Sequence, residues 1–181
     1  DVPVTLGADN AVGALSSRVS GTVNLDPELE LGTRIEDLNG ARDLGVTLGV
    51  IEASFNGDAA FQIDLTGSDT IEDAIDAVIA AIQDYEATSG NTVLGPGGVS
   101  VAGESLTVDV PAGTLVFSDL QGGVTASDLG LDIAGFDAAT TTGNATDPRL
   151  TWSTDIASLT GLAGTLGSIG LDNNGKSFVI D

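Results

Sequence analysis

Residues 55–82, FNGDAAFQIDLTGSDTIEDAIDAVIAAI, decide the fold of this chain. Apolar residues lie on both sides of Asn56-Gly57, a dipeptide that readily adopts the positive φ angles of a tight hairpin turn. The first half of the stretch therefore predicts a β-hairpin. The stretch also holds six acidic side chains, so the function depends on whether these acids form a site or cover a scaffold.

The second half of the stretch predicts one long amphipathic helix. Apolar residues recur at helical spacing from Ile71 to Tyr85, and Gly90 ends the pattern. Thr70 is the expected N-cap, with Asp69 as the alternative, because both side chains accept hydrogen bonds from the free N–H groups of a first helical turn.

Each acid of the stretch has a structural role available. Asp73, three residues after the expected cap, takes the place of the acid in a capping box. Glu72 and Asp76 lie in the first two turns, where the positive end of the helix dipole stabilises negative charge. Asp58 belongs to the hairpin turn, and we expect Asp64 to make a fixed structural hydrogen bond. These acids therefore indicate a scaffold.

Shorter elements surround this stretch. Thr33 and Glu36 have capping-box spacing, so we expect a brief helical turn that points Ile35 and Leu38 inward and ends at Asn39-Gly40. Residues 105–110 alternate apolar and polar side chains, and a Pro-Ala-Gly turn at 111–113 leads to a second strand at 115–117.

Further along the chain, Thr125 or Ser127 is expected to cap another short turn before an Asp-Leu-Gly stop. The pairs Gly97-Gly98 and Gly122-Gly123 are read as turns, because neither precedes a helix N-terminus with a Lys that could hold a phosphate. The sequence as a whole predicts an α+β fold, mainly β, that is rich in hairpins and has one long helix.

The C-terminal part of the chain repeats an earlier part. Asn56-Gly57 recurs as Asn174-Gly175 at an offset of 118, and the Phe-x-Ile-Asp pattern of residues 61–64 recurs at 178–181. Upstream, Thr33, Ile35, Leu38 and Gly40 recur at an offset of 121 as Thr154, Ile156, Leu159 and Gly161. We therefore expect a strand and loop segment at 1–23, a first repeat at 24–136, a polar linker at 137–147 and a partial second repeat at 148–181.

Composition excludes several classes of function. The 181 residues include 27 acidic and 5 basic ones, and a net charge of −22 opposes binding to nucleic acid or anionic lipid. The sequence has no Cys and no His, so an enzyme would depend on carboxylates alone or on carboxylates with Lys176, and we expect no enzymatic activity. The sequence contains no run of about 18 apolar residues, so it predicts no membrane-spanning segment. The start at Asp1 shows no cleavable secretory signal and reads as part of a longer protein.

The sequence contains three candidate sites, and none is expected to act. Asp73 and Asp76 could form a hydrolase pair, but their helix face should be wet, so nothing would separate their pKa values. Residues 170–181 resemble a calcium loop through Asp172, Asn174, Gly175 and Asp181, yet Gly170 stands where the first ligand belongs. Asn144-Ala145-Thr146 is a glycosylation sequon, a triplet that often arises by chance. We predict no catalytic, cofactor or metal residues.

Residues 33–131 resemble the hook-associated IN repeat of bacterial flagellar proteins. The resemblance rests on FQIDLTGSDTIEDAIDAVIAA (61–81), TASDLGL (125–131) and the lead-in TRIEDLNGARDLG (33–45), which is most similar to that of hook-associated proteins at the hook–filament junction. Flagellins and filament cap proteins carry the same repeat. Ala80 stands where the family's helix usually has Asn.

The resemblance implies a structural subunit of the flagellum, with no catalytic step and no cofactor. It implies export without a cleavable signal to an extracellular position, in the outward-facing central region of a hook-associated protein. The implied partners are other flagellar subunits, including flagellin, together with self-assembly. A secreted calcium-dependent adhesin or a carbohydrate-binding β module is the alternative, which a calcium-specific shift of the melting temperature would favour.

Overall fold

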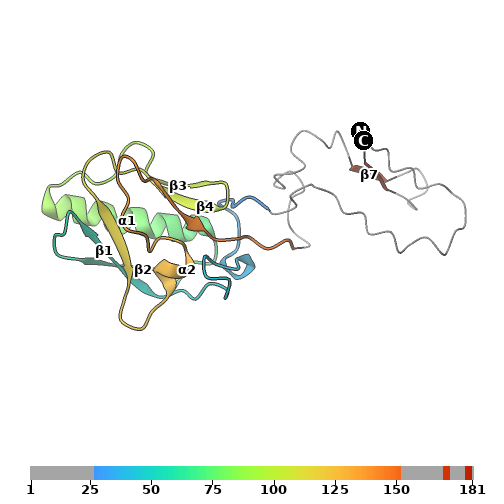
Figure 1. Cartoon of the computed structure of the whole chain (residues 1–181), viewed down its shortest axis with the longest axis horizontal. Helices are drawn as coiled ribbons and strands as arrows, with labels where there is room; N and C mark the ends of the chain where they lie inside the picture. Colours follow the sequence, from blue (N-terminus) through green and yellow to red (C-terminus); the bar gives the residue numbers. More distant parts are fainter. Residues whose placement is uncertain (1–26, 152–168, 172–177, 181) are drawn as a thin grey trace, which may run out of the picture.

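The computed structural model describes residues 27–151, 169–171 and 178–180. Over these residues the chain is α+β and mainly β, with two antiparallel three-stranded sheets and one long helix, as the sequence predicts (Figure 1). The expected strands at 1–23, most of the second repeat and the calcium-like loop lie outside the described residues.

The predicted hairpin forms the first sheet together with a later strand. Its order is β2-β1-β5, with β1 at Val50–Phe55, β2 at Phe61–Asp64 and β5 at Leu115–Asp119. The chain turns at Asn56 and Gly57, whose φ angles are 52° and 78°, and the Asp58 N–H donates to the Phe55 carbonyl at 2.9 Å. The Asn-Gly prediction is therefore confirmed.

The second sheet contains a strand from the segment that was expected to be a linker. Its order is β3-β4-β6, with β3 at Val99–Ala102, β4 at Ser105–Val108 and β6 at Thr142–Ala145. The alternation over 105–110 is confirmed, since Leu106, Val108 and Val110 are buried. Residues 137–147 do not leave the fold as a linker, because β6 pairs antiparallel with β4 through a register shift. Their polarity reflects an edge strand whose side chains face solvent.

Helix α1, at Ile71–Ser89, begins and ends where the sequence predicts. Thr70 accepts a hydrogen bond from the Asp73 N–H, and the Asp73 carboxylate accepts from the Thr70 N–H, which completes a capping box. Gly90 ends the helix in the left-handed conformation with φ 76°. The face that carries Ile71, Ala74, Ile75, Val78 and Ile82 is buried.

The two shorter caps differ from the prediction. The turn η1, at Ile35–Asp37, buries Ile35 and Leu38 as expected, but the Thr33 hydroxyl accepts from the Glu30 N–H and does not cap the turn. Helix α2, at Thr125–Asp128, has no side-chain cap from its own N-cap residue. Both short elements take their partners from chain segments that lie outside the local sequence pattern.

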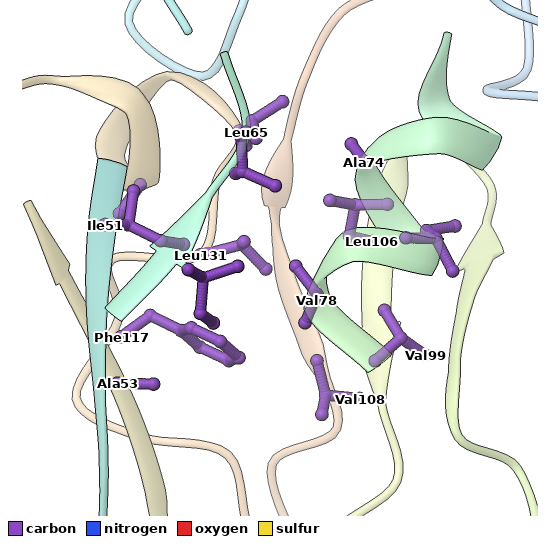
Figure 2. Packing of buried hydrophobic residues seen from close by; sticks show 14 of the residues in the cluster. Ile51, Ala53, Leu65, Ala74, Val78, Val99, Leu106, Val108, Phe117 and Leu131 are labelled. Atoms are coloured by element: carbon purple, nitrogen blue, oxygen red, sulfur yellow. The ribbon is translucent and has the colours of Figure 1, made fainter. Parts of the chain in front are cut away.

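One aliphatic core joins both sheets and the helix. Figure 2 shows Ile51, Ala53 and Phe117 of the first sheet facing Val78 of α1, with Leu106 and Val108 of the second sheet beyond it. Phe117 and Phe136 meet edge to face with ring centroids 5.6 Å apart. The layers are therefore sheet, helix and sheet around a single buried cluster.

A second hairpin has the same register as the first. Strands β7 (Ile169–Leu171) and β8 (Phe178–Ile180) pair antiparallel, with Ile169 opposite Ile180 and Leu171 opposite Phe178. In the first hairpin Ile51 lies opposite Ile63, and Ala53 lies opposite Phe61. The offsets are 118 on the first strand and 117 on the second, so the second loop is one residue shorter. Equal registers support the predicted repeat, whose boundaries stay a prediction.

Candidate functional site at the base of the folded unit

The chain enters and leaves the folded unit side by side. We call residues 36–47 and 146–149 the base. There the Arg149 N–H donates to the Asp37 carbonyl at 2.7 Å, and the Asn39 N–H donates to the Asp147 carbonyl at 3.0 Å. The Asn39 side-chain amide also donates to the Asp147 carboxylate at 2.7 Å. The two segments are therefore antiparallel, with the incoming and outgoing ends at the same place.

The incoming chain upstream of the base and the exit segment are both fixed to the turn between β3 and β4. The Leu29 N–H donates to the Gly103 carbonyl at 2.8 Å, and the Thr146 N–H donates to the next carbonyl, that of Glu104, at 2.8 Å. Thr146 is fully buried, and its hydroxyl donates to the same Glu104 carbonyl. Entry and exit thus bind successive residues of one turn.

A buried carboxylate holds the loop that follows the entry segment. Asp128 at the end of α2 is fully buried, and its side chain accepts from Arg42 Nε at 2.7 Å and from the Thr47 N–H at 3.0 Å. Its carbonyl accepts from the Ala41 N–H at 2.8 Å. We call this set of contacts the Asp128 clasp. It satisfies a buried charge that would otherwise be costly.

The clasp changes the electrostatics of its cation. The pKa of Arg42 is raised, first by its hydrogen bond to Asp128 and also by the negative charges of Asp128 and Asp119, while partial burial opposes the shift. The clasp therefore favours the charged form of Arg42. Its side chain is 37% exposed, so the clasp lies at the boundary between core and solvent.

A second carboxylate positions the helix that carries Asp128. Asp119, at the end of β5, accepts from the Ala126 N–H at 2.6 Å and from the Ser127 N–H and hydroxyl. The expected cap residues act differently, because the Thr125 hydroxyl donates to the Thr47 carbonyl at 2.8 Å. The acid from the neighbouring strand thus replaces the local cap.

Acids of residues 55–82 have structural partners. Asp64 accepts from the Thr66 N–H at 3.0 Å and from its hydroxyl at 2.7 Å, and these bonds lower the pKa of Asp64, so the fixed hydrogen bond is confirmed. Asp58 accepts from the Tyr85 hydroxyl at 2.9 Å and ties the hairpin loop to α1.

The two acids of the candidate hydrolase pair lie on the exposed face of α1. Asp73 and Asp76 are exposed on α1, as are Glu72 and Asp84. Hydrogen bonds from the Thr70 hydroxyl and N–H and from the Asp69 N–H lower the pKa of Asp73, whereas a general acid needs a raised pKa. Asp73 therefore lacks the raised pKa of a general acid.

Two candidate sites remain, the glycosylation sequon at 144–146 and the calcium-like loop at 170–181. The sequon has an exposed Asn144 in β6, but its Thr146 is the buried exit residue described above. The loop with Asp172, Asn174 and Asp181 lies outside the described residues, as does Lys176. Within 27–151 no group of three or more acidic side chains is arranged to hold a metal ion.

The residues that organise the base follow no local sequence pattern and were not predicted. Arg42, Asp119 and Asp128 are separated by many positions, so no local periodicity links them. One signal was present, because Ala-x-Asp-Leu-Gly occurs both at 41–45 and at 126–130, the two segments that the clasp joins. Two copies of one short motif could have suggested that they meet.

Comparisons of the chain with protein-family models, with curated proteins and with solved structures found no match. In the part of the chain that the structure describes, no helix is both long and apolar enough to cross a membrane.

Proposed function

We propose that the chain is a structural part of a bacterial flagellum, namely the outward-facing central region of a hook-associated protein at the hook–filament junction. In this proposal it has no catalytic step and no cofactor, it is extracellular and exported without a cleavable signal, and its partners are flagellin, other hook-associated proteins and copies of itself. The proposal starts from the sequence resemblance.

The observation that supports it best is the arrangement of the base. A domain that stands outward from an assembly has to receive the chain and return it at one place, and termini that lie close together are typical of inserted domains. Here the entry and exit segments pair with each other through Asn39 and Asp147 and share the turn at 103–104. The rest of the unit is thus free to project away from the flanking chain.

The rigidity of the unit also fits a positioning role. The first N–H groups of α1, at Ile71 and Glu72, donate to the carbonyls of Thr33 and Leu31, so the helix start is fixed to the entry segment. No buried side-chain nitrogen or oxygen within 27–151 lacks a hydrogen-bond partner. Rigid packing of this kind would place neighbouring subunits at fixed angles, which is the mechanism that we propose.

Immuno-electron microscopy of the organism that encodes the chain tests this proposal. Antibodies against the folded unit should label a narrow band between hook and filament, and a strain without the gene should bear hooks without filaments. Labelling along the whole filament would instead assign the chain to flagellin, and labelling of the tip would assign it to the cap. Labelling of the cell surface away from flagella would reject the flagellar proposal.

A calcium titration distinguishes the adhesin alternative. Under the flagellar proposal, millimolar calcium should shift the melting temperature of the full chain no more than the same concentration of magnesium does, because both divalent ions screen an acidic surface alike. A large shift with calcium alone would favour the adhesin. The titration also covers the loop with Asp172 and Asn174, which the structure does not describe.

A further inference from the structure

We propose that the exit side of the unit, residues 141–149, acts as a strap under tension. A pulling force between the flanking parts of the chain detaches this strap first, while the Asp128 clasp keeps the entry side folded. The proposal concerns the folded unit itself and does not depend on the flagellar assignment. It assigns a mechanical role to contacts that otherwise only close the fold.

The antiparallel arrangement of the entry and exit segments determines the order in which a pulling force breaks their contacts. The entry and exit segments are antiparallel, and the bond from Arg149 to Asp37 lies nearest the outgoing end, while the incoming end is held further upstream by the bond from Leu29 to Gly103. The bridge between Leu38 and Pro148 and the bonds from Asn39 to Asp147 follow further in. A force that separates the two ends therefore breaks these contacts one after another and not all together.

The exit side, residues 141–149, is held mainly by backbone hydrogen bonds and has few buried side chains. The side chains of β6 are exposed or half-buried, and among residues 141–149 only Thr146 and Pro148 are buried. The backbone of this segment is held by its pairing with β4, by the bond from the Asn144 N–H to the Gly130 carbonyl and, at its far end, by the bond from the Val108 N–H to the Thr141 carbonyl. Little apolar surface has to be exposed when it detaches.

The entry side is fixed much more firmly. Leu29 and Ile35 are buried in the core, and the carbonyls of Leu31 and Thr33 accept the first N–H groups of α1. Beyond Gly40 the clasp begins, and opening it would leave the fully buried Asp128 carboxylate without its cation. Charge-assisted bonds in a buried place are the stronger class of hydrogen bond. Peeling should therefore proceed from the exit end and stop before β1.

Force spectroscopy on the full chain, held by peptide tags at its two ends, tests the proposal. We expect a first, reversible step at low force that releases nine residues, which is about 30 Å at about 3.3 to 3.6 Å for each residue. A second, larger step should follow when the core unfolds. A single step in which the whole unit unfolds would overturn the proposal.

Two variants assign the steps to the two sides. Thr146→Ala removes a buried anchor of the exit side and should lower the force of the first step only. Arg42→Ala weakens the clasp and should lower the force of the second step while the first is unchanged. If Arg42→Ala lowers the force of the first step, the entry side opens first and the proposal is wrong.

A reversible lock provides a control that does not depend on a destabilised variant. The sequence has no Cys, so Asn39→Cys with Asp147→Cys introduces one possible disulfide between the strap and the entry segment, at side chains that already touch. The oxidised chain should lose the 30 Å step, and adding a reductant should restore it in the same molecule. A first step that persists in the oxidised chain would mean that another segment opens.

Discussion

Asp128 is the residue on which the base depends. It is fully buried, and it joins α2, where it resides, to the distant entry loop at two points: the Arg42 side chain and the Thr47 N–H shortly before β1. A buried carboxylate of this kind is stable only while its partners remain. Losing the carboxylate in turn leaves its donors without an acceptor.

We predict that Asp128→Ala lowers the free energy of unfolding by about 2 to 3 kcal/mol, because it orphans the Thr47 N–H and the guanidinium together. Asp128→Asn keeps an acceptor for Thr47 and should cost less. The matched control is Arg34→Ala, which breaks the exposed ion pair with Glu36 and should change stability by less than about 0.5 kcal/mol. Urea unfolding measures all three, and equal effects of Asp128→Ala and Arg34→Ala would contradict the prediction.

Asp73 gives a pH dependence of known sign. Its pKa is lowered from the ordinary 3.8 by the hydrogen bonds of Thr70 and Asp69, so its contribution to stability is complete above that value and is lost as the pH falls through the depressed folded value. We predict that Asp73→Asn is less stable than the natural chain at pH 7 and that the difference shrinks below about pH 3.8. Thermal melts at several pH values test this, and a difference that stays constant would show that Asp73 does not act through its charge.

At the scale of elements, the sequence predicted what local chemistry determines. The hairpin at Asn56-Gly57 and the helix from Thr70 to Gly90 have their turn, cap and stop residues within a few positions of each other, so the pattern and the structure agree. The hydrogen bond of Asp64 was predictable for the same reason, since its partner is two residues away.

The elements that were missed depend on distant partners. The polarity of residues 137–147 predicts a linker, yet β4 supplies a free edge that turns four of them into a strand. The cap of α2 comes from Asp119 on another strand, and the clasp joins segments 86 residues apart. Because the contacts that join the two segments of the base are all of this distant kind, their pairing was not predicted from the sequence.

The pairing of β6 depends on a close approach at Gly130. This glycine has φ 71°, and a Cβ there would overlap the backbone carbonyl of Asn144 in β6. We predict that Gly130→Ala destabilises the fold clearly more than Gly122→Ala, which has φ 82° and open space around it and should cost only the left-handed strain of about 1 to 2 kcal/mol. Urea unfolding compares the two, and equal losses would mean that β6 moves aside freely.

At the scale of the whole molecule, the unit is closed on itself at one end. Leu29 and Thr146 bind the neighbouring carbonyls of Gly103 and Glu104, so the first and last parts of residues 27–151 meet although they are far apart in sequence. The core lies between the sheets and does not depend on the order in which the chain visits them. Connectivity at the base should therefore be exchangeable for connectivity elsewhere.

Circular permutation tests this property. We predict that a chain in which residue 151 is joined to residue 27 by a short Gly-Ser linker, and which is opened at the exposed turn between Gly122 and Gly123, keeps the native circular dichroism and one cooperative urea transition. The control is the linear fragment 27–151, which contains the same residues in their natural order and has no linker. If the fragment folds and the permuted chain does not, then the entry and exit segments need the freedom that joining removes, and a unit inserted through a narrow base would no longer be supported. If both fold with similar stability, the contacts at the base act as a closure that any flanking chain can use, which is the property that an outward domain of a larger assembly requires.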